Sequence, residues 1–387
     1  MASEIRSRDM IERLIGFDTT SRNSNLELIE FVRDYLSGFG IDGRLTFDDD
    51  KRKANFYATI GPDDRPGVML SGHTDVVPVD GQAWDSEPFS LTERDGRLYG
   101  RGTCDMKSFL AVALSYVPQM VARPLRTPIH LAFSYDEEVG CIGVHRLIRD
   151  FENLAVKPVA CIVGEPTDMR VITAHKGKCS YTCHVRGHEC HSSMIHIGVN
   201  AVEIAAEIVA HLRAMARRFR EQGPHDADYD PPYTSVHTGT IRGGTALNIV
   251  PKDCSFEFEW RHLPEHDSDE IFAEVQRLAD SLLPEMHVVA PDTGIGFTEL
   301  SAIIGLETDP TAEVVALVKA LTGANATSKV SFGTEAGAFQ RAEVPTVVCG
   351  PGSIEQAHKP NEFVSLEQVR LCEAFMERLL AHVRDGA

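Results

Sequence analysis

The chain has 387 residues, of which 43% are hydrophobic and 25% charged, a composition typical of a globular protein that is long enough for two domains. Its formal net charge of -19 at pH 7 disfavours nucleic acid and anionic membrane surfaces as partners and favours a cationic substrate. The nine cysteines are an odd number, and the N-terminus carries neither an export signal nor an apolar segment of membrane length. These features predict a cytoplasmic protein with reduced thiols and no membrane partner.

The first half of the chain predicts alternating helices and strands. Two amphipathic helices are expected between about residues 8 and 40, separated by a stretch rich in helix caps and turn formers. Beyond them, short apolar runs alternate with helical patterns; the runs lie at 68–70, 129–133, 159–163 and 344–349, and the helices at about 106–121, 141–152, 310–322 and 365–384. This alternation predicts an α/β catalytic domain with a mostly parallel central sheet flanked by helices.

The middle of the chain has a different pattern. A polar strand is followed by a long helix opened by Asn200, and two further strands come after an acidic loop. In the second of these strands, 254–261, apolar and polar side chains alternate, so one face packs and the other meets water. We therefore predict an inserted α+β domain at 177–291 and a discontinuous catalytic domain made of residues 1–176 and 292–387.

Several buried strands run into residues of the kind that bind metals, and open α/β sheets gather their sites at strand ends. His73 and Asp75 follow the first apolar run and lie two residues apart, so Asp75 can accept the second ring N–H of a metal-bound His73. Glu137 and Glu138 follow the second run, and adjacent carboxylates diverge. One of the two can therefore bind metal while the other faces the substrate.

Three further segments supply candidate ligands. Glu165 follows the third apolar run, Asp105 is expected at the N-cap of a helix, and His358 follows the fourth run and a glycine-rich turn. Each residue alone is weak support, but their joint occurrence favours a metal centre. Carboxylates and imidazoles without paired thiolates favour zinc, with manganese or cobalt as alternatives. Two divalent ions and three carboxylates leave one charge for a bridging hydroxide, as in two-metal hydrolysis.

These motifs resemble those of the M20 metallopeptidases, and the resemblance covers nearly the whole chain. The segments that carry it lie at 17–29, 71–78, 99–107, 136–138, 333–336 and 350–362. The first and the last look most like the acetylornithine deacetylase branch of that family. The resemblance implies the fold of the zinc-dependent exopeptidases, with the inserted domain acting as a lid and joining two subunits as a homodimer.

The family also implies how two zinc ions per subunit would be held. One ion would bind His73 and Glu165, and the other would bind Glu138 and His358. Asp105 would bridge the two ions. Cobalt or manganese would be possible substitutes.

Further roles follow from the same resemblance. Glu137 would act as the general base that takes a proton from water and passes it to the leaving amine. His191 of the inserted domain would reach the site of the neighbouring subunit and stabilise the tetrahedral oxyanion; His188 lies three residues earlier, and which of the two acts stays open. Asn248 and Arg261 match positions that bind the substrate carboxylate.

The expected substrate is a small N-acyl amino acid. The resemblance implies hydrolysis of N-acetyl-L-ornithine to L-ornithine and acetate, in arginine biosynthesis. Succinyl-diaminopimelate desuccinylase, acetylcitrulline deacetylase and dipeptidase are the alternatives within the class. A catalytically silent binding protein is the alternative outside it, but all the expected ligands and Glu137 are present. The chain lacks a phosphate-binding Gly-Lys motif and a Gly-x-Ser-x-Gly elbow, which disfavours nucleotide enzymes and serine hydrolases.

Overall fold

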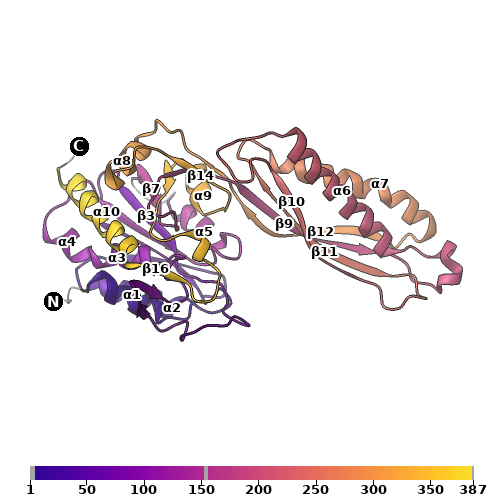
Figure 1. Cartoon of the computed structure of the whole chain (residues 1–387), viewed down its shortest axis with the longest axis horizontal. Coiled ribbons are helices and arrows are strands. Elements are labelled where there is room, and N and C mark those ends of the chain that lie inside the picture. The colour runs from indigo at the N-terminus through magenta and orange to yellow at the C-terminus, as the bar shows by residue number, and fades with distance from the viewer. Residues whose placement is uncertain (1–4, 152–155, 386–387) are drawn as a thin grey trace. The chain divides into compact units, whose positions relative to one another are not determined.

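The fold is that of a computed structural model, which describes residues 5–151 and 156–385 (Figure 1). The chain divides into two compact units. The first comprises Met1–Ala174, Leu306–Lys329 and Thr334–Ala387, and the second comprises His175–Gly305 and Val330–Gly333. Within the described ranges, the helices are all too short or too polar to cross a membrane.

A nine-stranded sheet forms the centre of the first unit, in the order β1-β2-β6-β3-β7-β15-β8-β13, with β14 paired to β8. Its central strands β6, β3, β7 and β15 are parallel, whereas β1, β2 and β8 pair antiparallel with their neighbours. The predicted α/β fold with a mostly parallel centre is confirmed. The strands are β1 (Gly43–Phe47), β2 (Ala54–Ile60), β3 (Val68–His73), β6 (Ile129–Ser134), β7 (Ala160–Val163), β8 (Ile172–His175), β13 (Leu306–Glu307), β14 (Ser328–Val330) and β15 (Thr346–Val348).

Helices cover both faces of this sheet. The main core includes side chains of α1, α2, α3, α8 and α10, whereas α5 and α9 pack on the opposite face. Strand β2 contributes to both sides, because Phe56 belongs to the main core while its neighbour Tyr57 contacts Phe151 of α5. Burial on both faces explains why the strands have continuous apolar runs. The helices are α1 (Ser7–Ile15), α2 (Leu26–Ser37), α3 (Lys107–Ser115), α4 (Val117–Ala122), α5 (Ile142–Phe151), α8 (Glu313–Thr322), α9 (Ala336–Arg341) and α10 (Leu366–Asp385).

One predicted helix of this unit is broken in two. The pattern at 106–121 predicts a single helix, but α3 ends at Ser115 and α4 begins at Val117. Pro118 explains the break, because a proline inside a helix removes a backbone hydrogen bond and collides with the preceding turn. A small three-stranded sheet, β16-β5-β4, completes the unit with β4 (Thr92–Arg94), β5 (Arg97–Tyr99) and β16 (Phe363–Ser365).

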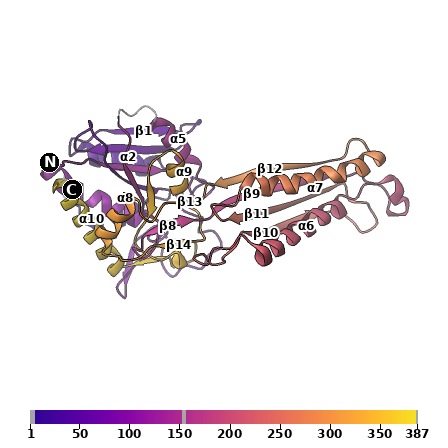
Figure 2. The ribbon, with the colours of Figure 1, turned by 90° about the horizontal axis from the view of Figure 1, so that it is seen from above.

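The second unit is a four-stranded antiparallel sheet in the order β10-β11-β9-β12, covered on one face by two long helices (Figures 1 and 2). The predicted alternation along β11 is confirmed, because Cys254, Phe256, Phe258 and Trp260 are all buried. These side chains belong to the core beneath the helices. The elements are β9 (Gly177–Arg186), α6 (Ala201–Gln222), β10 (Ser235–Gly243), β11 (Asp253–His262), α7 (Ser268–Val289) and β12 (Gly294–Ile303), with the short 3-10 helix η1 (Ser192–Ile197).

The second unit ends later than the sequence pattern predicts. The prediction places the end at residue 291, whereas the observed unit continues to Gly305. The reason is β12, which pairs antiparallel with β9 along almost its whole length. Because β12 is an edge strand with glycines and polar residues, it lacks the apolar pattern that marks a buried strand. Helix α7 was also not predicted; Pro284 lies inside it and interrupts the helical pattern.

We expect a buried histidine to make the first unit sensitive to acid. His130 on β6 is 4% exposed, and the hydroxyls of Tyr57 and Thr59 lie 2.9 and 3.0 Å from its Nδ1. Burial lowers the pKa of His130 from 6.5 to about 4. In acid the unfolded chain therefore takes up a proton before the folded chain does. Stability should fall as the pH drops from 6.5 to about 4, by up to about 1.4 kcal/mol per pH unit from this group.

This dependence is measurable by urea unfolding between pH 7 and pH 4.5. We expect His130→Asn to flatten the loss of unfolding free energy, because its amide oxygen can still accept from Tyr57 and does not titrate. His237→Asn is the matched control, since His237 is exposed. Equal slopes for His130→Asn and the unsubstituted protein would contradict the prediction.

Candidate metal centre and active site

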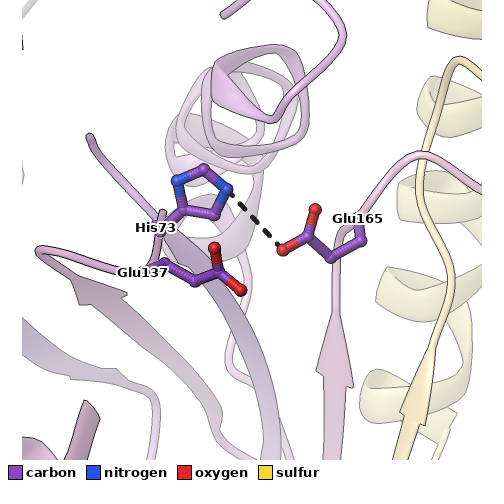
Figure 3. Close-up of side chains that lie close together, drawn as sticks. All are labelled: His73, Glu137 and Glu165. Atoms are coloured by element: carbon purple, nitrogen blue, oxygen red, sulfur yellow. Dashed lines mark ion pairs between the residues drawn. The ribbon is translucent and has the colours of Figure 1, made fainter. Parts of the chain in front are cut away.

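The candidate ligands of the first unit are gathered at one end of its central sheet. Strand β3 ends in His73, and the adjacent parallel strands β6 and β7 run into Glu137 and Glu165. Parallel strands in register deliver their following residues to the same edge of a sheet. The three side chains face one another there (Figure 3), and one ligand atom of each lies within 4.8 Å of the other two.

Glycines let α3 approach this edge closely. A Cβ atom added to Gly72, just before His73, would lie 2.2 Å from the Met106 side chain. A Cβ added to Gly164, just before Glu165, would lie 2.0 Å from the ring of Phe109. Any larger residue at either position would push α3 and the residue before it away from the strand ends.

Asp105 lies between two imidazoles. Its Oδ1 is 2.9 Å from Nε2 of His73, and its Oδ2 is 3.3 Å from Nε2 of His358. The sequence predicts Asp105 as the N-cap of α3, and this prediction is wrong. The N-cap is Met106, and the carboxylate of Asp105 turns toward the imidazoles. This position, with one oxygen facing each imidazole, suits a carboxylate shared by two ions.

Two further glutamates complete the cluster. Oε2 of Glu138 lies 2.9 Å from Nε2 of His358, and Oε1 of Glu165 lies 3.6 Å from Nε2 of His73. The remaining oxygen of Glu138, Oε1, is buried and has no hydrogen-bond partner among the described residues. A buried carboxylate oxygen without a partner is costly unless a cation or water satisfies it.

The electrostatics of the cluster fit divalent cations. Burial and the charge of Asp105 raise the pKa of Glu138 to about 7, and burial raises the pKa of Glu137 to about 8. Burial also raises the pKa of Glu165 well above its ordinary value. Burial alone would also raise the pKa of Asp105. Hydrogen bonds from His358 and His73 outweigh the effect of burial, so the pKa of Asp105 is lowered. Crowded carboxylates of this kind are stabilised by a bound cation, so the donor set suits a pair of metal ions.

Asp75 contacts His73 differently from the prediction. Nδ1 of His73 lies 2.8 Å from the backbone carbonyl oxygen of Asp75, whereas the carboxylate oxygen is 3.6 Å away. Because a carbonyl oxygen only accepts, Nδ1 carries the proton and Nε2 is free for a metal. The carboxylate instead accepts the backbone N–H groups of Glu137 and Glu138, at 3.1 and 3.2 Å, and the hydroxyl of Ser21 at 2.8 Å.

A buried acid behind the cluster was not assigned a role from the sequence. Glu335 is 1% exposed and accepts hydrogen bonds from Ser71 on β3 at 2.7 Å and from Ser134 on β6 at 2.6 Å. It therefore ties together the two strands that lead to His73 and Glu137. Glu335 lies in the motif at 333–336, one of the segments that carry the family resemblance. Its role could not be predicted, because the serines that it contacts lie far away in sequence.

Three predicted site residues belong to the second unit. His191 is the N-cap of η1, is exposed, and accepts the backbone N–H of Ser193 at Nδ1. Asn248 lies on a neighbouring segment, because its carbonyl accepts from the backbone N–H of Ser192 at 3.0 Å. Arg261 lies on the polar face of β11, where its Nε donates to Glu259 at 3.2 Å. The structure thus places His191 beside the segment of Asn248, and the roles of all three stay predictions.

The alternative histidine lies on the same part of the second unit. His188 forms a backbone bridge with Val199, just before the N-cap of α6. Its position gives no reason to prefer it to His191 or to exclude it.

Known proteins are similar to this chain over most of its length. Residues 69–382 match the model of peptidase family M20/M25/M40, so the chain belongs to that family. The chain is 34% identical to the acetylornithine deacetylase of Myxococcus xanthus over 98% of both proteins. Together these matches identify it as a metal-dependent amidohydrolase that acts as an N-acyl amino acid deacylase.

Solved structures share the fold. An M20 family metallo-carboxypeptidase from Sulfolobus solfataricus has a TM-score of 0.77 at 17% identity, covering 97% of this chain and 98% of that chain. A dinuclear metal-binding peptidase of the M20 family from Bacillus subtilis has a TM-score of 0.65 at 14% identity, covering 98% and 99%. These similarities show that the M20 fold extends over nearly the whole chain.

Proposed function

We propose that this chain hydrolyses N-acetyl-L-ornithine to L-ornithine and acetate, a step of arginine biosynthesis, with two zinc ions per subunit. The observation that carries the substrate is the 34% identity with an acetylornithine deacetylase over 98% of the chain. The net charge of -19 also suits a product with a cationic side chain. A cytoplasmic location belongs to the proposal and agrees with nine free cysteines.

The proposed ligands follow the observed contacts. His73 and Glu165 would hold one zinc ion, Glu138 and His358 would hold the other, and Asp105 would bridge them. The placement of Asp105, 2.9 Å from one imidazole and 3.3 Å from the other, supports the bridging role. The dinuclear centre of the Bacillus subtilis relative supports two ions rather than one. Cobalt or manganese would be a substitute with the same ligands.

Glu137 is the proposed general base. When bound, the metal ions polarise the scissile carbonyl and make water more acidic. Glu137 accepts the proton of the attacking water and transfers it to the nitrogen of the leaving amine. Its buried carboxylate faces His73 and Glu165, and the thiol of Cys141 donates to its Oε1 at 3.4 Å. Burial, which raises the pKa of Glu137, strengthens it as a base once it is charged.

The second unit would supply the remaining contacts. His191 would stabilise the oxyanion in the site of a second subunit, and Asn248 with Arg261 would bind the substrate carboxylate. This arrangement requires a homodimer formed through the second unit. The exposed position of His191 at the start of η1 agrees with a residue that acts on a partner.

A substrate panel on zinc-loaded protein tests the proposal. We expect N-acetyl-L-ornithine to be cleaved with the highest kcat/KM, above N-acetyl-L-citrulline, N-succinyl-diaminopimelate and a dipeptide. Cleavage of each substrate is measured by chromatographic separation and quantitation of the products, and metal-free protein is the control. Preference for another substrate of the panel would contradict the proposed substrate, N-acetyl-L-ornithine, but would leave the chain a metal-dependent amidohydrolase. No turnover of any member by metal-loaded protein would support the silent binding protein instead.

A further inference from the structure

A buried glutamate supports the loop that carries Asp105. Glu362 is 1% exposed and lies just before β16. Its Oε1 accepts the backbone N–H groups of Cys104 at 2.8 Å and Asp105 at 3.0 Å, and its Oε2 accepts that of Gly102 at 3.1 Å. One carboxylate therefore satisfies three backbone N–H groups of a loop that has no regular secondary structure of its own.

The same carboxylate is connected to the segment that carries His358. Nη1 of Arg101, which is also 1% exposed, donates to Oε2 of Glu362 at 2.5 Å. Nη2 of Arg101 donates to Oε1 of Gln82 at 2.8 Å, and Nε2 of Gln82 donates to the carbonyl oxygen of His358 at 3.0 Å. A continuous path of hydrogen bonds thus joins the backbones of Asp105 and His358.

His358 needs such support. Its φ is 62°, which is unfavourable for a residue with a side chain, and its side chain is 53% exposed. It is preceded only by the three-residue 3-10 helix η2 (Ile354–Gln356). The hydrogen bond that Gln82 donates to the carbonyl oxygen of His358 therefore restrains a backbone held in an unfavourable conformation.

We propose that Glu362, Arg101 and Gln82, here called the Glu362 clamp, fix the separation between Asp105 and His358 and so set the geometry of the metal centre. This inference rests on the proposed ligand roles of those two residues. Glu362 is a positioning residue, because it acts through the backbone of a ligand. Groups that orient metal ligands contribute to metal affinity although they do not touch the ion.

The clamp requires a carboxylate rather than an amide. Glutamate offers two accepting oxygens to four donors, and Arg101 compensates its buried charge. In Glu362→Gln one oxygen becomes an NH₂ group, which would face N–H donors. The loop must then shift to relieve this conflict, and Asp105 shifts with it.

Metal titration tests the clamp on the full-length protein. Metal-free Glu362→Gln is titrated calorimetrically with Zn²⁺, and its Co²⁺ form is compared with the unsubstituted protein by visible absorption. We expect Zn²⁺ affinity to fall by about 10- to 100-fold and the Co²⁺ bands to shift. Glu367→Gln is the control, because Glu367 is exposed and pairs only with Arg370 among the residues described. A residue with a merely structural role would lower the thermal midpoint of the metal-free protein and leave metal affinity unchanged.

Gln82→Ala provides a second test, because Gln82 is only half-buried and its removal leaves the Arg101–Glu362 pair in place. We expect it to weaken binding of one Zn²⁺ ion by about 10-fold, the lower end of such effects. If folded Glu362→Gln binds Zn²⁺ as the unsubstituted protein does, the clamp is refuted. If Glu362→Gln does not fold, unchanged affinity in Gln82→Ala refutes it. Failure of the unsubstituted protein to bind two ions would instead refute the proposed metal centre.

Discussion

Glu137→Gln should lower kcat by about 10²- to 10⁴-fold, the range that a positioned general base contributes. The side chain keeps its size but loses the ability to accept a proton from water. Because none of the proposed metal contacts involves Glu137, the metal content should stay at the level of the unsubstituted protein. Turnover is followed by acetate release from N-acetyl-L-ornithine, and metal content by elemental analysis of the same sample.

The matched control for this change is Glu30→Gln. Glu30 lies on the exposed face of α2, so the same chemical change should leave kcat within a factor of two or so. A Glu137→Gln protein that turns over as fast as this control would remove Glu137 from the mechanism. A Glu137→Gln protein that is inactive because it has lost metal would make Glu137 a ligand instead of a base.

Asp105→Asn should have the largest effect on metal binding. Asp105 is 6% exposed and contacts the imidazoles of both His73 and His358. The substitution preserves shape but removes the negative charge shared by the two proposed ions. Because loss of an outer partner already costs about 10- to 100-fold in affinity, loss of the bridging ligand should cost about 100-fold or more for both ions. Competition with a chelator of known affinity measures this loss.

Activity gives an independent reading of the same variant. Asp105→Asn should be inactive at a Zn²⁺ concentration that saturates the unsubstituted protein, and a large excess of Zn²⁺ should restore part of its binding but little turnover. Asp280→Asn on the exposed surface of α7 serves as the control. Retention of two tightly bound ions by Asp105→Asn would contradict the bridging role.

The parts of the site that could be predicted share one physical origin. Strands buried on both faces have continuous apolar runs, so the polar residue that ends each run is conspicuous. His73 and Glu165 were visible for this reason, and parallel pairing explains why they meet. The helical pattern was also strong enough to place α10 within one residue of its observed bounds. The cap at Asn200 likewise predicted where α6 begins.

The parts that could not be predicted depend on contacts between distant residues. Glu362 accepts N–H groups from residues about 260 positions earlier, and backbone donors leave no mark on the sequence. The orientation of the Asp75 carboxylate likewise depends on the loop at Glu137, which competes with His73 for it. Two-residue spacing places Asp75 near His73 but does not decide between its carbonyl and its carboxylate.

The contact between Nδ1 of His73 and the carbonyl of Asp75 has a consequence for how this centre tolerates mutation. A main-chain acceptor is present whatever amino acid occupies position 75, so no single codon change there deletes it. The tautomer of His73 is therefore robust to genetic variation at its nearest polar neighbour. The loop that carries Glu137 and Glu138 has no such protection, since its backbone N–H groups depend on the Asp75 side chain. Substitutions at position 75 should therefore act through the proposed base Glu137 and the proposed ligand Glu138 rather than through His73.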